Sequence, residues 1–148
     1  MKMYRVVSEK EFKAVMGGKI VNCSKLNTQG YSKGKKGVFF FPRIPQGKIK
    51  NSFFVPWAQG KNSMVIIVDI PCNRVIAHGA GWYGNGMMPE MLVDSYGVED
   101  IRSYIPLDAL ESARKSGKAA ENGSSFFCRY DSSDGFITFS YYDPRWSK

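Results

Sequence analysis

Apolar residues along this chain fall mostly into short alternating or continuous runs, a pattern that favours strands over long helices. The clearest run is residues 64–70, which is rich in β-branched side chains and is closed by Pro71. Residues 3–7 alternate, and residues 38–41 form an aromatic run that ends at Pro42. These patterns predict three strands, and we expect the strand at 64–70 to lie at the centre of a sheet.

The second half of the chain predicts further strands and one hairpin. Short apolar runs recur at residues 74–77, 91–93 and 101–105. Residues 126–130 and 136–142 are separated by Asp, Ser and Gly residues typical of a turn, which predicts a β-hairpin. Residues 79–86 contain too many glycines for a regular element and predict a loop, and residues 117–125 predict a polar linker.

Helical signals are confined to two short segments. Ser8 and Glu11 have the spacing of a capping box, in which each side chain accepts from the backbone N–H of the other residue. Apolar residues at three- and four-residue spacing follow, and Gly17 and Gly18 predict the end of this helix. Residues 107–114 predict a second helix. Because strands and helices do not alternate regularly, we predict an α+β fold.

The composition predicts one folded domain. The chain has 148 residues, enough for a single core, so we expect one domain over residues 1–148. Hydrophobic residues make up 43%, with 10 Phe, 8 Tyr and 3 Trp, which excludes disorder caused by low hydrophobicity. The longest apolar run is too short to span a membrane, and the first residues lack the pattern of a signal peptide.

Cysteine and histidine usage argues against a disulfide framework and against a zinc site. The chain has three cysteines, Cys23, Cys72 and Cys128, with no Cys-x-x-Cys pair, and a single histidine, His78. We therefore expect no metal, and thiols kept in a reducing compartment such as the cytoplasm. His78 has no ionisable neighbour in sequence, which makes a structural or surface role more probable than a catalytic one.

Charge is distributed unevenly along the chain. The formal net charge is +8, yet residues 12–68 contain no Asp or Glu and carry ten Lys and Arg residues. Such a region attracts polyanions, whether nucleic acid, an anionic surface or the phosphates of a nucleotide, or simply forms a solvated surface. Within it, residues 22–36 are rich in Gly, Ser and Lys and predict a loop beside a binding site.

Familiar catalytic motifs, including the P-loop, G-x-S-x-G and H-E-x-x-H, do not occur in the sequence. Three other segments form a pattern: Tyr4-Arg5 on the first strand, the aromatic and proline-rich residues 39–45, and residues 89–93, where Glu90 opens a late strand. Across residues 3–107 this pattern resembles the ADP-ribosyltransferase superfamily. Phe-Phe-Pro-Arg-Ile-Pro at 40–45 and Glu-Met-Leu-Val at 90–93 are most similar to DarT-type enzymes, which modify DNA bases.

The resemblance implies a mostly antiparallel, split β-sheet of the ADP-ribosyltransferase type with a few short helices. It also implies a single catalytic domain that acts as a mono-ADP-ribosyltransferase, a glycosyltransferase with NAD as co-substrate and no metal. A small basic domain of this kind suits a bacterial toxin or effector that acts in the cytoplasm, its own or that of a target cell. Expected partners are a nucleic acid acceptor, favoured over protein, and a cognate antitoxin or immunity protein, with no membrane partner.

The resemblance, together with the chemistry of NAD and of polyanion binding, suggests roles for individual residues. Glu90 is expected to be catalytic, since a carboxylate beside the ribose of NAD stabilises the positive charge that develops there. Arg5 is expected to assist catalysis and to bind NAD. The other expected NAD-binding residues are Tyr31, Phe40, Arg43 and Trp82. The residues expected to contact nucleic acid are Lys33, Lys35 and Lys36.

Each assignment has an ordinary structural alternative. Glu90 also fits an exposed strand start, Arg5 a salt bridge and Arg43 the surface. Alternation along a strand allows at most one of the aromatic residues at 39–41 to face a ligand. The same lysines and aromatic residues would also suit a non-catalytic RNA- or DNA-binding module, which is the alternative function.

Two positions depart from the family pattern. Met88 stands where arginine-modifying members have the first Glu of Glu-x-Glu, which disfavours arginine as the acceptor. Arg5 stands where DarT-type enzymes are expected to have His.

Overall fold

Antiparallel strands make up most of the residues described by the computed structural model, together with one α-helix and short 3-10 turns. The described residues are 1–42, 44–45, 62–83, 86–108, 120–122, 126–131 and 136–142. The combination of antiparallel strands with an α-helix confirms the predicted α+β class. The helix found within these residues is too short to cross a membrane.

The first sheet has the order β1-β5-β9, with β5 in the middle. Its strands are β1 (Lys2–Val7), β5 (Met64–Asp69) and β9 (Ile101–Pro106), paired antiparallel. The prediction that residues 64–70 lie at the centre of a sheet is therefore confirmed. Val65, Ile66, Ile67 and Val68 are fully or almost fully buried, because both faces and both edges of β5 are covered.

Helix α1 (Glu9–Met16) begins where the sequence predicts. The Ser8 side chain accepts from the backbone N–H of Glu11 at 3.2 Å, and Gly18, with φ of 102°, adopts the left-handed conformation just past the helix end. The reciprocal half of the predicted capping box does not form. The Glu11 carboxylate instead accepts from Arg5 and Tyr96, since a charged partner binds it more strongly than a backbone amide.

The second sheet has the order β3-β7-β6 and carries Glu90. It consists of β3 (Val38–Phe40), β7 (Gly86–Val93) and β6 (Val75–Tyr83). The prediction of a loop over 79–86 is wrong for residues 79–83 and 86, which form strand, because β6 pairs with β7 along most of its length. Glu90 consequently lies inside β7 and does not open the strand.

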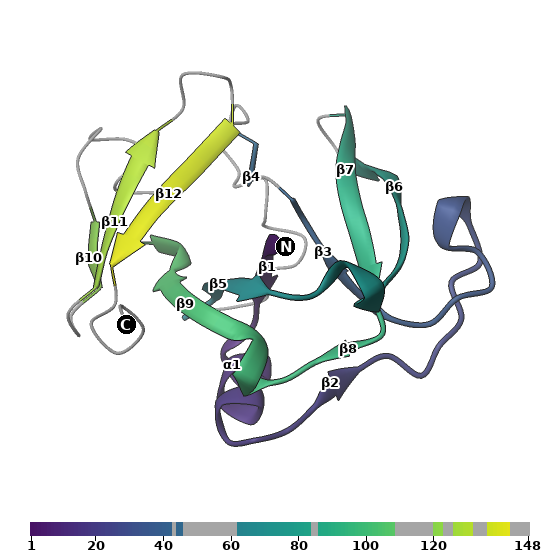
Figure 1. The fold of residues 1–148 in the computed structure, drawn as a ribbon, viewed down its shortest axis with the longest axis horizontal. Helices are drawn as coiled ribbons and strands as arrows, with labels where there is room; N and C mark the ends of the chain where they lie inside the picture. Colours follow the sequence, from purple (N-terminus) through teal and green to yellow (C-terminus); the bar gives the residue numbers. More distant parts are fainter. Residues whose placement is uncertain are drawn as a thin grey trace.

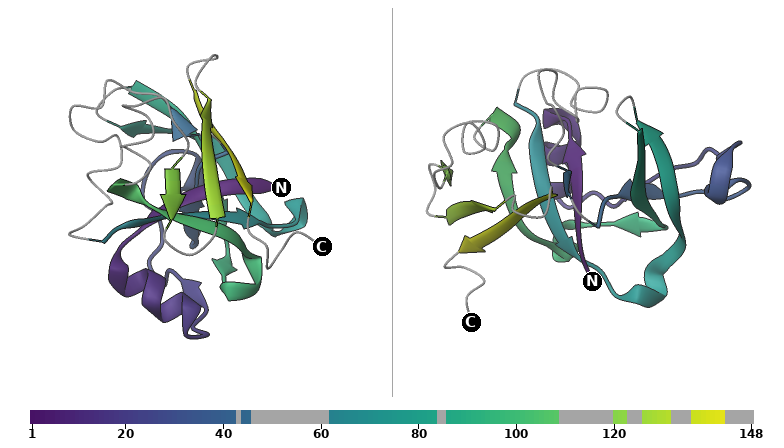
Figure 2. Two further views of the ribbon diagram at one scale, coloured as in Figure 1. Left: turned by 90° about the vertical axis from the view of Figure 1, so that its left-hand side faces the viewer. Right: turned by 90° about the horizontal axis from the view of Figure 1, so that it is seen from above.

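The two sheets meet between β1 and β3. Tyr4 and Phe41 exchange two backbone hydrogen bonds of 2.8 and 2.7 Å, which places the sheets side by side (Figure 1). The β6–β7 hairpin and the blue η1 segment then lie at the end away from β11 and β12 (Figure 1), and the view from above in Figure 2 shows the same separation.

The remaining described elements are short or belong to the C-terminal hairpin. β11 (Phe126–Asp131) and β12 (Phe136–Tyr142) pair antiparallel, which confirms the predicted hairpin. β10 (Ala120–Asn122) pairs with β11, so part of the predicted linker is a strand. The other elements are β2 (Val21–Asn22), β4 (Ile44–Pro45), β8 (Ser95–Tyr96) and the 3-10 turns η1 (Gly30–Ser32), η3 (Cys72–Arg74) and η4 (Val98–Asp100). Residues 109–114 of the second predicted helix lie outside the described residues.

Among the described residues, a cluster of buried side chains joins α1 to both sheets. It includes Val15 of α1, Ile66 and Val68 of β5, and Phe40 of β3. Phe40 meets the ring of Tyr96 edge to face, with centroids 5.3 Å apart. One face of the β3-β7-β6 sheet, the inner face, thus packs in the core, and we call the opposite face the outer face.

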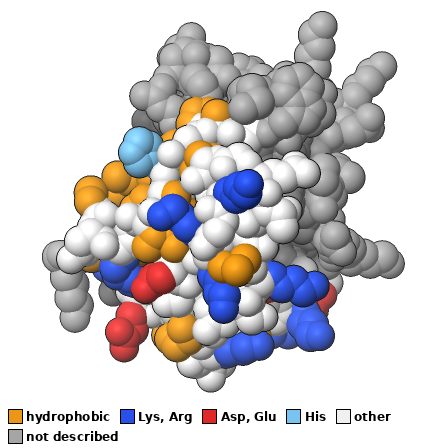
Figure 3. Space-filling model, turned by 90° about the vertical axis from the view of Figure 1, so that its right-hand side faces the viewer, with side chains coloured by type: hydrophobic (Ala, Val, Ile, Leu, Met, Phe, Trp, Pro, Cys, Tyr) orange, Lys and Arg blue, Asp and Glu red, His pale blue; other side chains and the backbone are white. Residues whose placement is uncertain are grey.

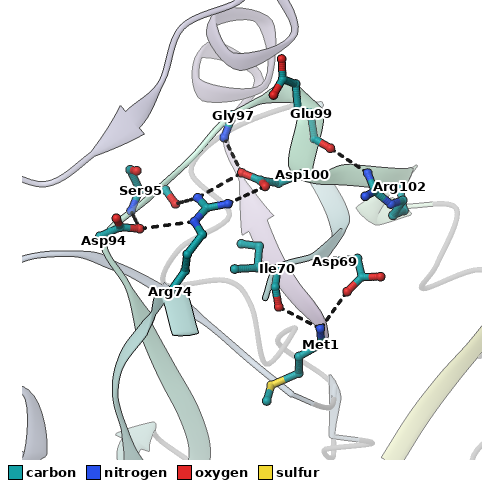
Figure 4. A network of polar contacts seen from close by, with 10 residues as sticks. All are labelled: Met1, Asp69, Ile70, Arg74, Asp94, Ser95, Gly97, Glu99, Asp100 and Arg102. Atoms are coloured by element: carbon teal, nitrogen blue, oxygen red, sulfur yellow. Dashed lines mark hydrogen bonds and ion pairs between the residues drawn. The ribbon is translucent and has the colours of Figure 1, made fainter. Parts of the chain in front are cut away.

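A polar network holds the chain where it leaves β7 (Figure 4). Arg74 donates from Nη1 to Asp100 Oδ1 at 2.7 Å and from Nη2 to the carbonyl oxygen of Ser95 at 2.7 Å. Asp100 Oδ2 also accepts from the backbone N–H of Gly97 at 3.0 Å. η3, β8 and η4 are therefore tied together beside the end of β7.

Candidate active site

A cavity of about 450 Å³ lies between the η1 segment and the outer face of the β3-β7-β6 sheet. Its described wall is Asn27, Thr28, Gln29, Gly30, Tyr31 and Ser32 on one side, and Phe39, Ala80, Gly81 and Glu90 on the other. This volume is in the range of cavities that bind small molecules. The part of the sheet face that carries Glu90 therefore lies beside the loop that the sequence predicts to lie next to a site.

Glu90 supplies the charge of this cavity. It lies on β7 opposite Gly79 of β6, and its residue exposure is 6%. A carboxylate is rarely this buried unless a partner or a ligand compensates its charge. Glu90 is the only charged residue among the described residues of the cavity wall. The structural alternative of an exposed residue at a strand start is thereby contradicted.

Tyr31 covers Glu90 from the η1 side. Its ring lies against Gly79, the residue paired with Glu90, and its hydroxyl is buried without a well-aligned hydrogen bond to any described residue. Burial, together with the charge and the nearby oxygen atoms of Glu90, raises the pKa of the Tyr31 hydroxyl above that of a free tyrosine. Tyr31 therefore stays protonated and offers a hydrogen-bond donor next to a carboxylate.

The segment that carries Tyr31 is closed on itself at its base. The backbone N–H and the Nδ2 of Asn27 both donate to the carbonyl oxygen of Lys35, at 3.0 and 2.9 Å. Gly34 returns a hydrogen bond to the carbonyl oxygen of Asn27 at 2.8 Å, in a left-handed conformation with φ of 78°. These bonds close the base of the loop that carries Tyr31.

Arg5 is placed outside the described wall of the cavity. Its Nε and Nη2 donate to the Glu11 carboxylate at 2.9 and 3.2 Å, and its Nη1 donates to the carbonyl oxygen of Phe39 at 3.0 Å. Tyr96 donates to the same Glu11 carboxylate at 2.6 Å. The Arg5 guanidinium is thus bound by α1 and β3, and Arg5 is not part of the described cavity wall that contains Glu90.

Phe39, and not Phe40, lines the cavity. Phe40 has 0% exposure and packs on the core face of β3, so the expectation that it binds NAD is corrected. The reason is alternation: neighbouring residues of a strand face opposite sides of the sheet. Strand alternation predicted that at most one of the phenylalanines at 39–41 would face a ligand. Which of them faces the cavity depends on how β3 pairs with β7.

The other candidate residues are only partly placed. Trp82 lies on β6 opposite Met87, but its side chain lies outside the described residues, as do those of Arg43 and Met88. His78 is exposed on β6, as expected for a surface histidine. Cys23 and Cys72 are exposed free thiols.

Gly79 was not predicted as a site residue. The signal that could have found it is a glycine inside a strand, which marks close approach of another group.

Exposed lysines cluster around the loop. Lys25, Lys33, Lys35 and Lys36 are exposed and make no ion pair with the residues that the structure describes. Lys and Arg side chains gather on the face of the molecule on which η1 lies (Figure 3). The charge available for a polyanion therefore lies beside the cavity and not in its described wall.

No protein-family model matches this chain, and no curated protein and no solved structure matches it significantly. Within the described ranges, no three His, Cys, Asp or Glu side chains are arranged to hold a metal ion.

Proposed function

We propose that this protein is a mono-ADP-ribosyltransferase that transfers ADP-ribose from NAD to a macromolecule, with nucleic acid favoured as the acceptor. The observation that carries the proposal is the buried Glu90 carboxylate in a cavity of about 450 Å³ under Tyr31. The position of Glu90 in this cavity accords with the role that the family resemblance gives it.

The cavity suits the nicotinamide end of NAD. The nicotinamide ring of NAD is a cationic aromatic group, and the cavity offers one carboxylate and the rings of Tyr31 and Phe39. A negatively charged phosphate would be repelled by Glu90 inside the cavity. The pyrophosphate is accordingly assigned to the surface outside it, on the side of the exposed lysines.

The reaction needs a group that stabilises positive charge on the ribose. The bond between the ribose C1′ and the nicotinamide nitrogen breaks, and nicotinamide leaves with the electron pair. An acceptor atom forms the new bond to C1′ and releases its proton. Glu90, held in a weakly solvated position, stabilises the developing positive charge more strongly than water does.

The fold supports the same proposal at a coarser level. The β1-β5-β9 and β3-β7-β6 sheets are antiparallel and meet at the Tyr4–Phe41 bridge, which suits a split sheet of the ADP-ribosyltransferase type. The exposed lysines beside the cavity favour a polyanionic acceptor over a protein.

The test is incubation of the purified protein with labelled NAD, alone and with DNA, RNA or cell lysate. Glu90→Gln is expected to lower label transfer and nicotinamide release by about 100- to 1000-fold, the usual effect of removing one electrostatic stabiliser. Glu99→Gln, at an exposed position outside the cavity wall, is the matched control and should keep wild-type activity. Circular dichroism establishes that both variants are folded.

A competition experiment tests the charge of the cavity separately. 1-Methylnicotinamide keeps the positive charge of the NAD ring and is expected to compete with NAD better than neutral nicotinamide does. Equal competition by the two compounds would contradict the role given to Glu90. Salt-dependent nucleic acid binding with no nicotinamide release under any condition would instead support the non-catalytic binding module.

A further inference from the structure

Gly79 lies in strand β6, and the ring of Tyr31 occupies the space that a side chain at position 79 would fill. A Cβ atom added to Gly79 would lie 2.5 Å from Cγ and 2.7 Å from Cδ1 of Tyr31, closer than real carbon atoms approach. Gly79 does not have a positive φ, so the backbone does not require glycine there. The position requires glycine because the Tyr31 ring lies directly on the backbone of β6.

The pairing of β6 with β7 gives this contact a consequence for the cavity. Gly79 lies opposite Glu90, so a ring resting on Gly79 brings its hydroxyl beside the carboxylate. The Tyr31 hydroxyl is buried without a well-aligned hydrogen bond to a described residue, yet it lies near enough to Glu90 that, besides burial, the oxygens and the charge of that carboxylate raise its pKa. A buried hydroxyl whose hydrogen bond is poorly aligned has capacity left for a ligand.

We propose that Gly79 is a positioning residue, which seats the Tyr31 ring on β6 so that the Tyr31 hydroxyl and the Glu90 carboxylate form one polar pair for a bound ligand. The pair combines a donor with an acceptor, and it therefore suits a neutral ligand group that both accepts and donates a hydrogen bond, such as a hydroxyl or a carboxamide. The inference deepens the proposed function and rests on it for the identity of the ligand, NAD.

The position of Tyr31 can be measured without any enzymatic assay. 3-Fluorotyrosine placed at residue 31 reports its surroundings through its ¹⁹F resonance and its own ionisation. Gly79→Ala is expected to shift this resonance, because the added methyl group displaces the ring. Glu90→Gln is expected to lower the pH at which the fluorotyrosine ionises, since a nearby negative charge is removed.

Gly97→Ala is the matched control. A Cβ atom at Gly97 would meet only the flexible end of Ile20, at 2.7 Å, and Gly97 lies outside the wall of this cavity. This variant should leave the resonance at residue 31 and the activity unchanged. A double-mutant cycle adds a second control: in a Tyr31→Ala background, Gly79→Ala no longer meets a ring and should have less than about a twofold effect on the KM for NAD.

In the wild-type background, Gly79→Ala is expected to raise the KM for NAD by about 10- to 100-fold, the usual cost of misplacing a binding group. An unchanged ¹⁹F resonance in Gly79→Ala would overturn the positioning role, whatever the activity. An equal loss in the Tyr31→Ala background would also overturn it. If the resonance shifts as expected but the wild-type protein does not turn over NAD, the positioning role is upheld and the proposed function fails.

Discussion

Replacement of Glu11 by alanine removes the acceptor that Arg5 and Tyr96 share. Three hydrogen bonds are lost: two from Arg5, of 2.9 and 3.2 Å, and one from the Tyr96 hydroxyl, of 2.6 Å. The Arg5 and Glu11 side chains are 24% and 22% exposed, so the arginine left behind is only partly solvated. The variant therefore leaves a guanidinium and a buried hydroxyl without their main partner.

The size of the effect follows from that burial. Removing one member of a fully buried ion pair costs about 3–5 kcal/mol, and an exposed pair contributes about 0–1 kcal/mol. With about a quarter of each side chain exposed, we expect Glu11→Ala to lower the free energy of unfolding by about 3 kcal/mol. For a chain of this length, that corresponds to a fall in Tm of roughly 6–12 °C.

Urea titration followed by circular dichroism measures this loss, with two companion variants. Tyr96→Phe removes only one of the hydrogen bonds and should cost about 1.5–3 kcal/mol. The double variant Arg5→Met with Glu11→Leu removes both charges. It should be more stable than Arg5→Met alone or Glu11→Leu alone, because each single variant leaves one charge without its partner. If Glu11→Ala stays within about 1 kcal/mol of the wild type, the pair does not contribute as its geometry suggests.

The pH dependence gives an independent check. Burial raises the pKa of Glu11, but the hydrogen bond and charge of Arg5 outweigh burial and hold the pKa below its usual range. A carboxylate with a lowered pKa stabilises the fold above its unfolded-state pKa and loses that contribution as the pH falls through its folded pKa. The stability difference between wild type and Glu11→Ala should therefore be constant at neutral pH and shrink once the pH passes below about 4.3, the ordinary glutamate value.

Three further substitutions test polar groups outside the cavity wall. Asp100→Asn weakens a bidentate contact to Arg74 in which the Asp100 side chain is 14% exposed, and urea titration should show a loss of about 2 kcal/mol. Asp94→Asn is its control, because that carboxylate is 57% exposed and 3.8 Å from Arg74, so it should change stability by less than about 0.5 kcal/mol. Ser103 Oγ is buried without a hydrogen bond among the described residues, and Ser103→Ala should leave Tm unchanged or raise it in a thermal melt. A clear loss of stability in Ser103→Ala would reveal a partner for that hydroxyl.

Local patterns predicted the elements that depend on local interactions. The start of α1 at the Ser8 cap, the strand β5 and the β11–β12 hairpin were all predictable, because capping, apolar runs and turn residues act over a few positions. The same patterns failed at residues 79–83. Their glycines favour a loop when taken alone, and they form strand only because β7, several residues later, supplies the backbone partners.

The candidate site shows a similar division. Glu90 and Tyr31 were predicted as site residues, and the structure brings them together beside one cavity. Arg5 and Phe40 were predicted alongside them, but Arg5 pairs with Glu11 and Phe40 packs in the core. Nothing in the sequence around Arg5 indicates which carboxylate lies within reach of its guanidinium after folding.

The sequence by itself determined the α+β class, the central position of β5 and the basic loop, because these depend on residue type and on spacing over short distances. The choice of Glu90 came from the family resemblance and not from its neighbours in the sequence. The tertiary structure alone decided that Phe39 faces the cavity and that the Tyr31 ring packs on Gly79. It also decided that Arg5 donates hydrogen bonds to Glu11 of α1 and to the backbone of β3. These outcomes depend on strand register and on contacts between segments far apart in the chain, and a shift of one residue in register would exchange the two faces of the sheet.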